Sequence, residues 1–400
     1  MRRTHRTHRR RQAGFTLIEM MVALAIGALV IAAVFMLGGA SARHFQEQQR
    51  VGVTQRSVRM AMSRLTRDVQ LAGYMHVPSE QAPTVNRCPT PALPRTVPAI
   101  WMADGDPTGN AALDSVNRAL NGVSADQLRL IGNFNTADQY LIDSVNRGGN
   151  TLFLQERWLS FQRNFTVPTT GGSRTADVQR FNATFAPGRM LHLETATRQH
   201  IFVTVSSAAI DSTARNATVT ITPALGANNP CLAGLGRGTL VSPLSEIRYQ
   251  IQAAPAGSTT APRSANVVGP NTQLVREELN MGDGTVIAGT RRTVLEYAID
   301  FNIDAWVDTS PPTLPPNIVR QNGAAAQATI QARPWQVRSL VVSLAARTPE
   351  QDRRFPWTYT GGRAATDPLN RFRVFTDRDG AARVRQITVD IQTPNLVPAQ

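Results

Sequence analysis

Lysine is missing from this 400-residue chain, in which all 42 basic residues are arginine. The absence excludes functions that depend on a lysine, among them Walker-type phosphate loops, Schiff-base chemistry and kinase-type phosphoryl transfer. GxSxG, HExxH and CxxC motifs are missing as well, and so is a glycine-rich phosphate loop. We therefore expect a protein that is not an enzyme and that uses no cofactor.

Acidic residues are missing from residues 1–14, which carry six arginines. Only one charged residue, Glu19, interrupts the apolar run that follows, FTLIEMMVALAIGALVIAAVFMLGGASA over residues 15–42. Roughly 20 apolar residues span a bilayer as a helix, and a basic flank stays in the cytoplasm. Residues 15–42 are therefore expected to cross a membrane. Without residues 1–14 the formal net charge falls from +14 to +8, so much of the basic character lies in this short segment.

Glu19 is costly where it stands, because a carboxylate in hydrocarbon costs roughly 2.5–3.5 kcal/mol on insertion scales. A cut between Gly14 and Phe15 would create an ammonium group on Phe15. That group is the nearest cation for Glu19, in the same chain or in a neighbouring one. A helix that pairs its buried charge with a neighbour's terminus gains free energy by polymerising in register. The alternative is a simple membrane anchor whose glutamate lies near the headgroups.

The order of these features resembles the class III leader of type IV pilins. A secretory signal peptide has its cleavage site after the apolar segment, whereas the Gly14–Phe15 pair precedes it here. The resemblance implies cleavage after Gly14 by a prepilin peptidase on the cytoplasmic face. It also implies methylation of the new N-terminal Phe15 and a role in assembly for Glu19, which becomes the fifth mature residue.

Residues 43–75 contain no proline and carry one apolar stripe at helical spacing. The stripe consists of Val51, Val58, Met62, Leu65 and Val69. Gly73 is expected to end the helix. Joined to the membrane segment, the helix would run from about Phe15 to Ala72, roughly 85 Å at 1.5 Å per residue. Its second half needs a surface to pack against.

Alternating apolar and polar residues dominate the chain beyond Val77, which is typical of half-buried antiparallel strands. The clearest segments are 201–205, 218–222, 295–304, 340–344 and 387–391. Asp283-Gly284 is expected to form a hairpin turn. The predicted fold class is therefore α+β, with a long N-terminal helix packed on a large antiparallel β-rich head. A boundary between two subdomains would fall near 253–271, but the strands on both sides could equally share one sheet.

The predicted organisation has four parts: a cleaved leader (1–14), a membrane and polymerisation helix (15–42), the amphipathic half of the helix (43–75) and the head (76–400). A head outside the inner membrane lies in an oxidising compartment, so Cys88 and Cys231 are candidates for a disulfide. Such a long closed loop would contribute about 4–5 kcal/mol in the chain-entropy model. Two unrelated buried thiols are the alternative.

Three later segments are similar to the PilW-like minor pilins. They are 61–74 (AMSRLTRDVQLAGY), 335–347 (WQVRSLVVSLAAR) and a closing block from 372 to 388, with its FRVFT strand and the start of the ITVDI strand (387–391). The membrane helix lacks the proline at which major pilins often kink, although Gly27 and the Gly38-Gly39 pair could supply flexibility.

Metal sites are expected to be absent. His192, Glu194 and His200 could form one on paper, but solvated strand residues explain them better. Strand alternation likewise explains the spacing of Asp300, Asn302 and Asp304, which lacks the glycine and the final glutamate of an EF-hand. A second imitation of a calcium loop has a serine, Ser115, in place of the bidentate acid; it consists of Asp104, Asp106, Thr108 and Gly109.

Arginines are densest outside the helix at Arg371, Arg373, Arg378, Arg383 and Arg385. Nucleic-acid binding would need such arginines on one face together with aromatic platforms. A solvated face is the preferred interpretation, and nucleic acid is the weaker candidate partner.

The resemblance implies a minor pilin that primes or supports type IV pilus assembly. Its partners would be the prepilin peptidase, other minor pilins, the major pilin and, before assembly, the inner membrane. The N-terminus would be cytoplasmic and the head periplasmic, until the head is displayed at or near the pilus tip, a position suggested by its size. Two alternatives stay open: a pseudopilin of a type II secretion system, and a tip adhesin or DNA-uptake receptor whose head binds a ligand.

Overall fold

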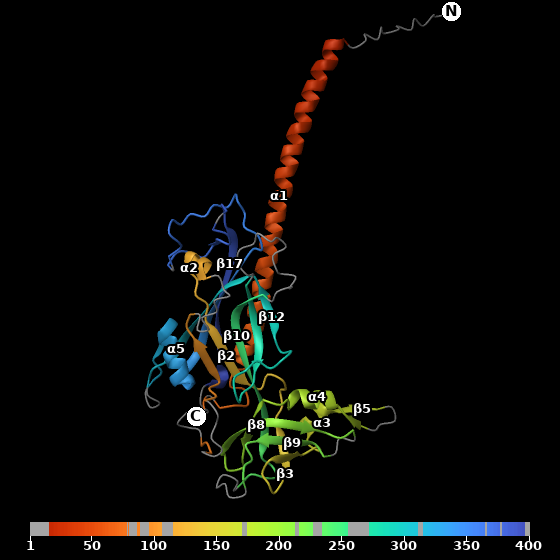
Figure 1. Ribbon diagram of the computed structural model, residues 1–400, viewed down its shortest axis with the longest axis vertical. Helices are drawn as coiled ribbons and strands as arrows, with labels where there is room; N and C mark the ends of the chain where they lie inside the picture. Colours follow the sequence, from red (N-terminus) through yellow and green to blue (C-terminus); the bar gives the residue numbers. More distant parts are fainter. Residues whose placement is uncertain are drawn as a thin grey trace, which may run out of the picture. The chain divides into compact units, whose positions relative to one another are not determined.

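A computed structural model describes residues 16–77, 79, 86–88, 96–105, 115–169, 174–212, 216–226, 234–254, 272–310, 315–364, 366–376 and 378–396. The chain divides into two units, Met1–Val53 and Thr54–Gln400. Helix α1 (Leu17–Gln70) runs without a break through 54 residues and contributes to both (Figure 1). The predicted α+β class is confirmed, since a long apolar helix is followed by a large antiparallel β-rich domain.

One sheet combines ten of the described strands, which form two parts that share the long strand β10 (Leu240–Ala253). The first part has the order β1-β2-β10-β11-β12. Its other members are β1 (Ile100–Ala103), β2 (Gln127–Gly132), β11 (Thr272–Leu279) and β12 (Arg292–Glu296). β10 and β11 flank residues 255–271 in the sequence and pair with each other, so the strands on both sides of this segment share one sheet.

The second part closes on itself through antiparallel pairs in the cycle β10-β3-β4-β9-β8-β7-β10. Its other members are β3 (Tyr140–Val145), β4 (Thr151–Leu154), β7 (Met190–Glu194), β8 (His200–Ala209) and β9 (Thr218–Thr222). The predicted strand 218–222 is therefore confirmed, and 201–205 lies within β8. A closed cycle leaves no free edge between its members.

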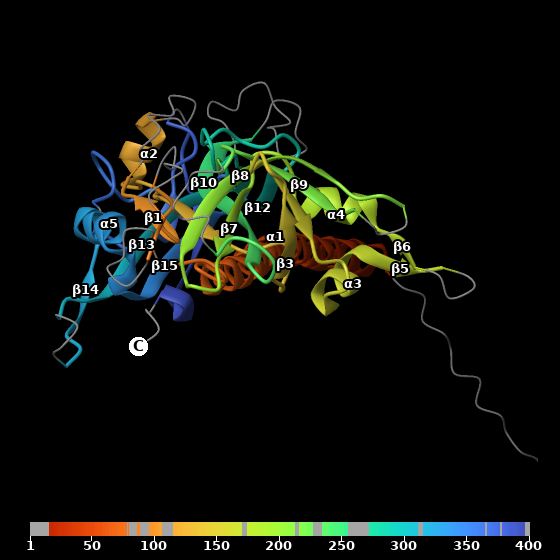
Figure 2. The ribbon, with the colours of Figure 1, turned by 90° about the horizontal axis from the view of Figure 1, so that it is seen from below.

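The other large sheet has the order β14-β13-β15-β17-β16. Its strands are β13 (Ala298–Asp308), β14 (Ile318–Gln321), β15 (Val337–Arg347), β16 (Arg371–Phe372) and β17 (Ala382–Gln392). The predicted strands at 340–344 and 387–391 lie in β15 and β17. These blue strands and the green strands of the closed cycle occupy different parts of the head (Figure 2).

Short elements complete the head. They are α2 (Ser115–Asn121), α3 (Leu159–Phe165), α4 (Val178–Thr184), α5 (Gly323–Ala332), the hairpin of β5 (Thr166–Pro168) and β6 (Arg174–Ala176), and the 3-10 turns η2 (Pro334–Gln336) and η3 (Pro394–Leu396). The Asp283-Gly284 turn is confirmed, because the N–H of Gly284 donates to Asn280 O at 2.7 Å and the residues beyond it form a Leu279–Val286 bridge.

The largest core joins α1 to both sheets. Leu65 and Val69 of α1 belong to one buried cluster with residues of β2, β10, β13, β15 and α5. A separate core fills the closed cycle and includes four phenylalanines of the α3–α4 region, two of which, Phe165 and Phe185, contact the ring of Tyr140. The amphipathic half of α1 therefore has the β-rich surface that its stripe requires.

The expected single strand over 295–304 is wrong. Tyr297 has a φ of 56° and separates β12 from β13, which belong to different sheets. A register shift between Ala298 and Asp300 follows. As a result Ile299 packs in a small cluster with Phe372, while Phe301 packs in the α1 core.

Candidate functional site

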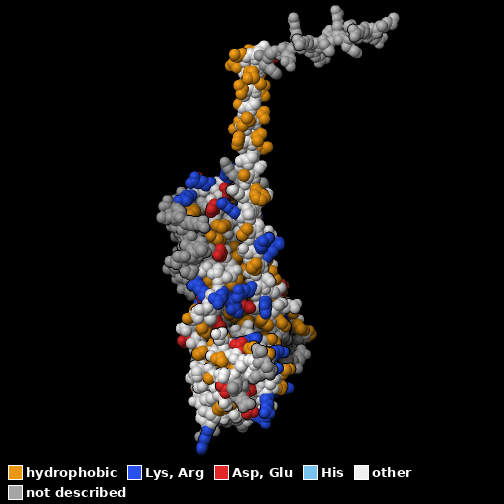
Figure 3. All heavy atoms as spheres, turned by 90° about the vertical axis from the view of Figure 1, so that its right-hand side faces the viewer, with side chains coloured by type: hydrophobic (Ala, Val, Ile, Leu, Met, Phe, Trp, Pro, Cys, Tyr) orange, Lys and Arg blue, Asp and Glu red, His pale blue; other side chains and the backbone are white. Residues whose placement is uncertain are grey.

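The first part of α1 is the one described helix that is long and apolar enough to cross a membrane. The stretch comprises the 23 residues Leu17–Gly39. At 1.5 Å per residue it is about 35 Å long, which exceeds the ~30 Å hydrocarbon core of a bilayer. Its apolar side chains are exposed, from 52% for Val22 to 79% for Leu17. Hydrophobic side chains cover this part of the helix in Figure 3.

Thr16 and Glu19 form a capping box at the start of this helix. The backbone N–H and the hydroxyl of Thr16 each donate to Oε2 of Glu19 at 2.9 Å, and the N–H of Glu19 donates to Oγ1 of Thr16 at 3.3 Å. These bonds satisfy N–H groups that have no carbonyl partner at a helix N-terminus. The T-x-x-E spacing was a signal for this cap. The expected pairing of Glu19 with an ammonium group did not include it.

The glycines of the helix do not interrupt it. Gly27, Gly38 and Gly39 all lie inside α1, and a Cβ added at any of them would meet no atom within 4 Å. The cleavage pair Gly14 and Phe15 lies outside the described residues, so the processing site remains a prediction.

The second part of α1 carries the predicted stripe. Val58, Met62, Leu65 and Val69 are buried, Val51 is half-buried, and Arg56, Arg59, Arg64 and Arg67 are exposed. Ala61 and Ala72 are buried too, because they lie on the same helical face.

Asp68 is the one acid in this buried face and fixes the helix to two strands. The hydroxyl of Tyr249 on β10 donates to its Oδ2 at 2.5 Å, and Nε of Arg276 on β11 donates to the same oxygen at 2.7 Å. Burial and the adjacent carboxylate raise the pKa of Tyr249, so the phenol stays a donor. The Arg67-Asp68 dipeptide thus places one charge in solvent and the other in a network between helix and sheet.

The Ala72-Gly73-Tyr74 segment closes the end of α1. Gly73 has a φ of 77°, and a Cβ on it would lie 3.1 Å from Asn395 O. Nδ2 of Asn395 donates to Gln70 O at 2.8 Å, which satisfies one of the carbonyls at the helix C-terminus. The helix ends at Gln70, two residues before the predicted end at Ala72, and Gly73 has the left-handed conformation expected of a residue that stops a helix. Its C-terminal partner, Asn395, had no signal in the local sequence.

Gly73 and Gly132 let the end of the helix lie directly on strand β2. The N–H of Gly73 donates to Ile131 O at 2.8 Å, and the N–H of Asn133 donates to Tyr74 O at 3.0 Å. A Cβ on Gly132 would lie 2.6 Å from Leu71 O, so only glycine allows this approach.

The expectation that His192 is a solvated strand residue is wrong, because it is 3% exposed. Its Nε2 lies 2.8 Å from Nδ1 of His200 and its Nδ1 lies 3.1 Å from Met75 O. His76 packs edge-on against His192. Burial lowers the pKa of His192 to about 3 and that of His76 to about 4, so both rings are neutral. Within the described ranges no group of three His, Cys, Asp or Glu could hold a metal ion.

Asp126 lies beside the start of one calcium-like sequence, at Asp104 and Gly105. The N–H of Gly105 donates to its Oδ1 at 3.0 Å and the N–H of Ile303 donates to its Oδ2 at 2.7 Å. Burial, with smaller contributions from Asp104 and Asp300, raises the pKa of Asp126 to about 7. The other members of that imitation, Asp106, Thr108 and Gly109, lie outside the described residues.

The dense arginine group is half-buried rather than a solvated face. Arg371 donates to Pro356 O at 2.7 Å, and Arg373 donates to Phe375 O and Thr376 O at 3.2 and 3.0 Å. Arg371 and Arg383 lie over the ring of Phe355, with guanidinium carbons 4.5 and 4.4 Å from its centroid. These side chains therefore hold together the loop-rich region around 348–381.

Comparison with known proteins gives one match. Residues 9–35 match the family model of the prokaryotic N-terminal methylation motif. Searches of curated proteins and of solved structures found no match to the chain. The motif and the apolar helix support a type IV pilin-like or pseudopilin-like protein that a prepilin peptidase processes and that is anchored in a membrane.

Proposed function

We propose that this chain is a PilW-like minor pilin that primes or supports type IV pilus assembly. The observation that carries the proposal is the exposed apolar stretch Leu17–Gly39, which follows a prepilin-type leader and contains Glu19 as its only charged residue. A helix that is apolar on all sides needs partners on all sides, first lipid and then other helices.

Cleavage after Gly14 frees the ammonium group of Phe15 in this proposal. The charge of Glu19 then pairs with a neighbouring subunit's terminus, while its Oε2 caps its own helix. The head remains periplasmic until it is displayed at or near the pilus tip. The arginines of the dense group are half-buried, and several donate to backbone carbonyls, which favours this assembly role over nucleic-acid uptake, because phosphate binding calls for solvent-exposed guanidinium groups on one face.

Glutamine at position 19 separates the two roles of Glu19. Glu19→Gln keeps a capping-box side chain but removes the charge, whereas Glu19→Ala removes both. We expect Glu19→Gln to reduce incorporation into sheared pili by about tenfold or more, because the neighbouring terminal ammonium then lacks its carboxylate partner. An unpaired charge in lipid costs roughly 2.5–3.5 kcal/mol, and about 1.4 kcal/mol is already a tenfold change. Wild-type incorporation of Glu19→Gln, with loss only in Glu19→Ala, would contradict the charge-pairing step.

Gly14 offers a control for the leader. Replacing it with a bulky residue should leave the unprocessed chain in the membrane, which mass spectrometry of the N-terminus would show. Proteins recovered with the chain from sheared pili, or from a secretion complex instead, distinguish a minor pilin from a type II pseudopilin.

The pairing of Cys88 with Cys231 is part of the same proposal. Cys88 is 4% exposed and its N–H donates to His200 O at 2.9 Å. Cys231 lies outside the described residues. Peptide mapping under non-reducing conditions tests the bond.

A further inference from the structure

The β13–β15–β17 sheet presents a polar face on the side opposite the α1 core. Phe301, Ile303 and Leu340 belong to that core. Cross-strand pairing places two rows on the other side: Trp306, Ser339 and Gln392, and next to it Asp304, Val341 and Asp390. Trp306 is half-buried, and Asp390 and Gln392 are exposed.

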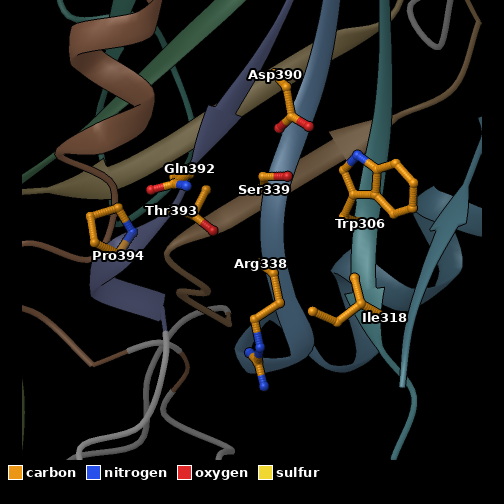
Figure 4. Close-up of a pocket in the computed structure, with 8 residues that line it drawn as sticks. All are labelled: Trp306, Ile318, Arg338, Ser339, Asp390, Gln392, Thr393 and Pro394. Carbon is orange, nitrogen blue, oxygen red and sulfur yellow. The ribbon is translucent and has the colours of Figure 1, made fainter. Parts of the chain in front are cut away.

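An open cavity of about 380 Å³ lies on this face. Figure 4 shows the side chains around it, which come from three adjacent strands, the edge strand β14 and the η3 turn. The lining consists of Trp306, Ile318, Arg338, Ser339, Asp390, Gln392, Thr393 and Pro394. Its size falls within the ~300–1,000 Å³ range of small-molecule sites.

Several hydrogen-bonding groups of the cavity have no intramolecular partner in the described part of the chain. They are the indole N–H of Trp306, the hydroxyl of Ser339, the carboxylate of Asp390 and the amide of Gln392. Together they supply donors and acceptors beside one aromatic ring. In a site open to solvent such groups can exchange water for the hydroxyls of a ligand.

The charges of the cavity exclude an anionic ligand. Nη2 of Arg338 donates to Asp308 at 2.9 Å, and Nη2 of the neighbouring Arg320 donates to Asp304 at 2.6 Å. Both guanidinium groups are therefore neutralised by carboxylates. Asp390 has no ion pair among the described residues and leaves the cavity with a negative charge.

We propose that this cavity binds a neutral saccharide, with one sugar ring stacked on Trp306 and its hydroxyls bonded to Ser339, Asp390 and Gln392. A pyranose has an apolar face of C–H groups that suits an aromatic ring and a rim of hydroxyls that both donate and accept. The site does not depend on the assembly role proposed above, because it lies wholly in the head.

The full chain in phosphatidylcholine nanodiscs provides the test, since alkyl glycoside detergents carry the proposed ligand class. Maltotriose, cellotriose and triacetylchitotriose are titrated calorimetrically, with trigalacturonate and oligothymidylate as anionic probes. We expect a neutral trisaccharide to bind in the millimolar range and the anions not to bind. Trp306→Ala should weaken binding by about tenfold or more, and Asp390→Asn by about threefold to tenfold.

Trp158→Ala is the matched control, because Trp158 is 43% exposed and does not line the cavity. It should bind sugar as the wild type does. If Trp306→Ala is misfolded by circular dichroism, Trp306→Phe and Asp390→Asn carry the test: Trp306→Phe keeps a ring and should stay within a few-fold of wild type. Absence of binding by all three neutral sugars, preference for an anion, or unchanged binding by Trp306→Ala and Asp390→Asn would each overturn the proposal.

Discussion

The two ends of α1 have the same backbone geometry and opposite surroundings. Leu29, near the middle of the apolar stretch, is 72% exposed, whereas Leu65 is fully buried in the head. The difference comes from the pattern around the helix rather than from helix propensity. An apolar residue on every side requires a surrounding solvent of lipid or other helices, whereas one stripe requires a single surface. The distribution of apolar residues thus determines which kind of partner each stretch needs.

Each stretch has one acid among its apolar residues, Glu19 in the first and Asp68 in the second, and the two acids differ in where their hydrogen-bond partners lie. Glu19 is satisfied by Thr16, three residues away in its own helix. Asp68 is satisfied by Tyr249 and Arg276, from strands far along the chain. A locally satisfied acid leaves the first stretch independent of the head, and a distantly satisfied one makes the second stretch part of it.

Truncating one leucine in each stretch should give the largest difference in the free energy of unfolding. Leu65→Ala should lower the free energy of unfolding of the head by about 2–5 kcal/mol, because it leaves a cavity in the main core. Leu29→Ala should change that free energy by less than about 0.5 kcal/mol. Denaturant unfolding followed by near-UV circular dichroism measures both. Equal effects would show that the two stretches are not energetically distinct.

Removing the distant acid should have a slightly smaller effect. Asp68→Ala leaves the Arg276 charge and the Tyr249 hydroxyl without their partner. We expect a loss of about 2–4 kcal/mol, towards the lower end for buried ion pairs, because both charged side chains keep some solvent contact. Arg67→Ala, at the exposed neighbouring position, should stay within about 0.5 kcal/mol. If Asp68→Ala left the free energy of unfolding unchanged, Asp68 would not contribute to holding the helix on the two strands.

The pH dependence of stability should come from the head, and Asp126 gives the smallest of the three effects. Burial holds its folded pKa at about 7, above the 3.8 of an aspartate in the unfolded chain, so its contribution to stability is complete below pH 3.8 and is lost as pH rises through 7. The stability difference between wild type and Asp126→Asn should therefore shrink by on the order of 2 kcal/mol from pH 5 to pH 8.

His76 and His192 act in the opposite direction in the wild type and in Asp126→Asn alike. Their lowered pKa values remove stability as pH falls from 6.5 towards 4 and 3. The difference between the two proteins therefore cancels the contribution of the histidines and reports Asp126 together with its neighbour Asp300, whose charge helps to raise the pKa of Asp126. A constant difference across the pH range would contradict a raised pKa for Asp126.

Local sequence patterns correctly predicted the features that residues close in the sequence determine. The spacing of Val58, Leu65 and Val69 identified the buried face of the helix, and Thr218–Thr222 was found with its observed bounds. Tyr297 could not be recognised as a break, because the apolar alternation continues through it in the sequence. His192 was misjudged because residues from outside its strand cover it: Met75 and His76, which follow α1, lie against its ring.

Most of the candidate helix site could be predicted, but its fixation to the head could not. The leader and Glu19 form a compact motif, whereas the partners of Asp68 and Asp126 come from distant strands. Those contacts depend on topology, for which the sequence had no local signal.

Asn395 makes the end of the helix depend on a residue from the far end of the sequence. Its hydrogen bond to Gln70 joins residues 325 positions apart, and Leu396 beside it fills the contact with Gly73. In chain order the helix comes first, and the residue that bonds a carbonyl at its end follows the last described strand, β17. A chain shortened before Asn395 would therefore keep the helix and every described strand but would lack the contact that closes the end of the helix.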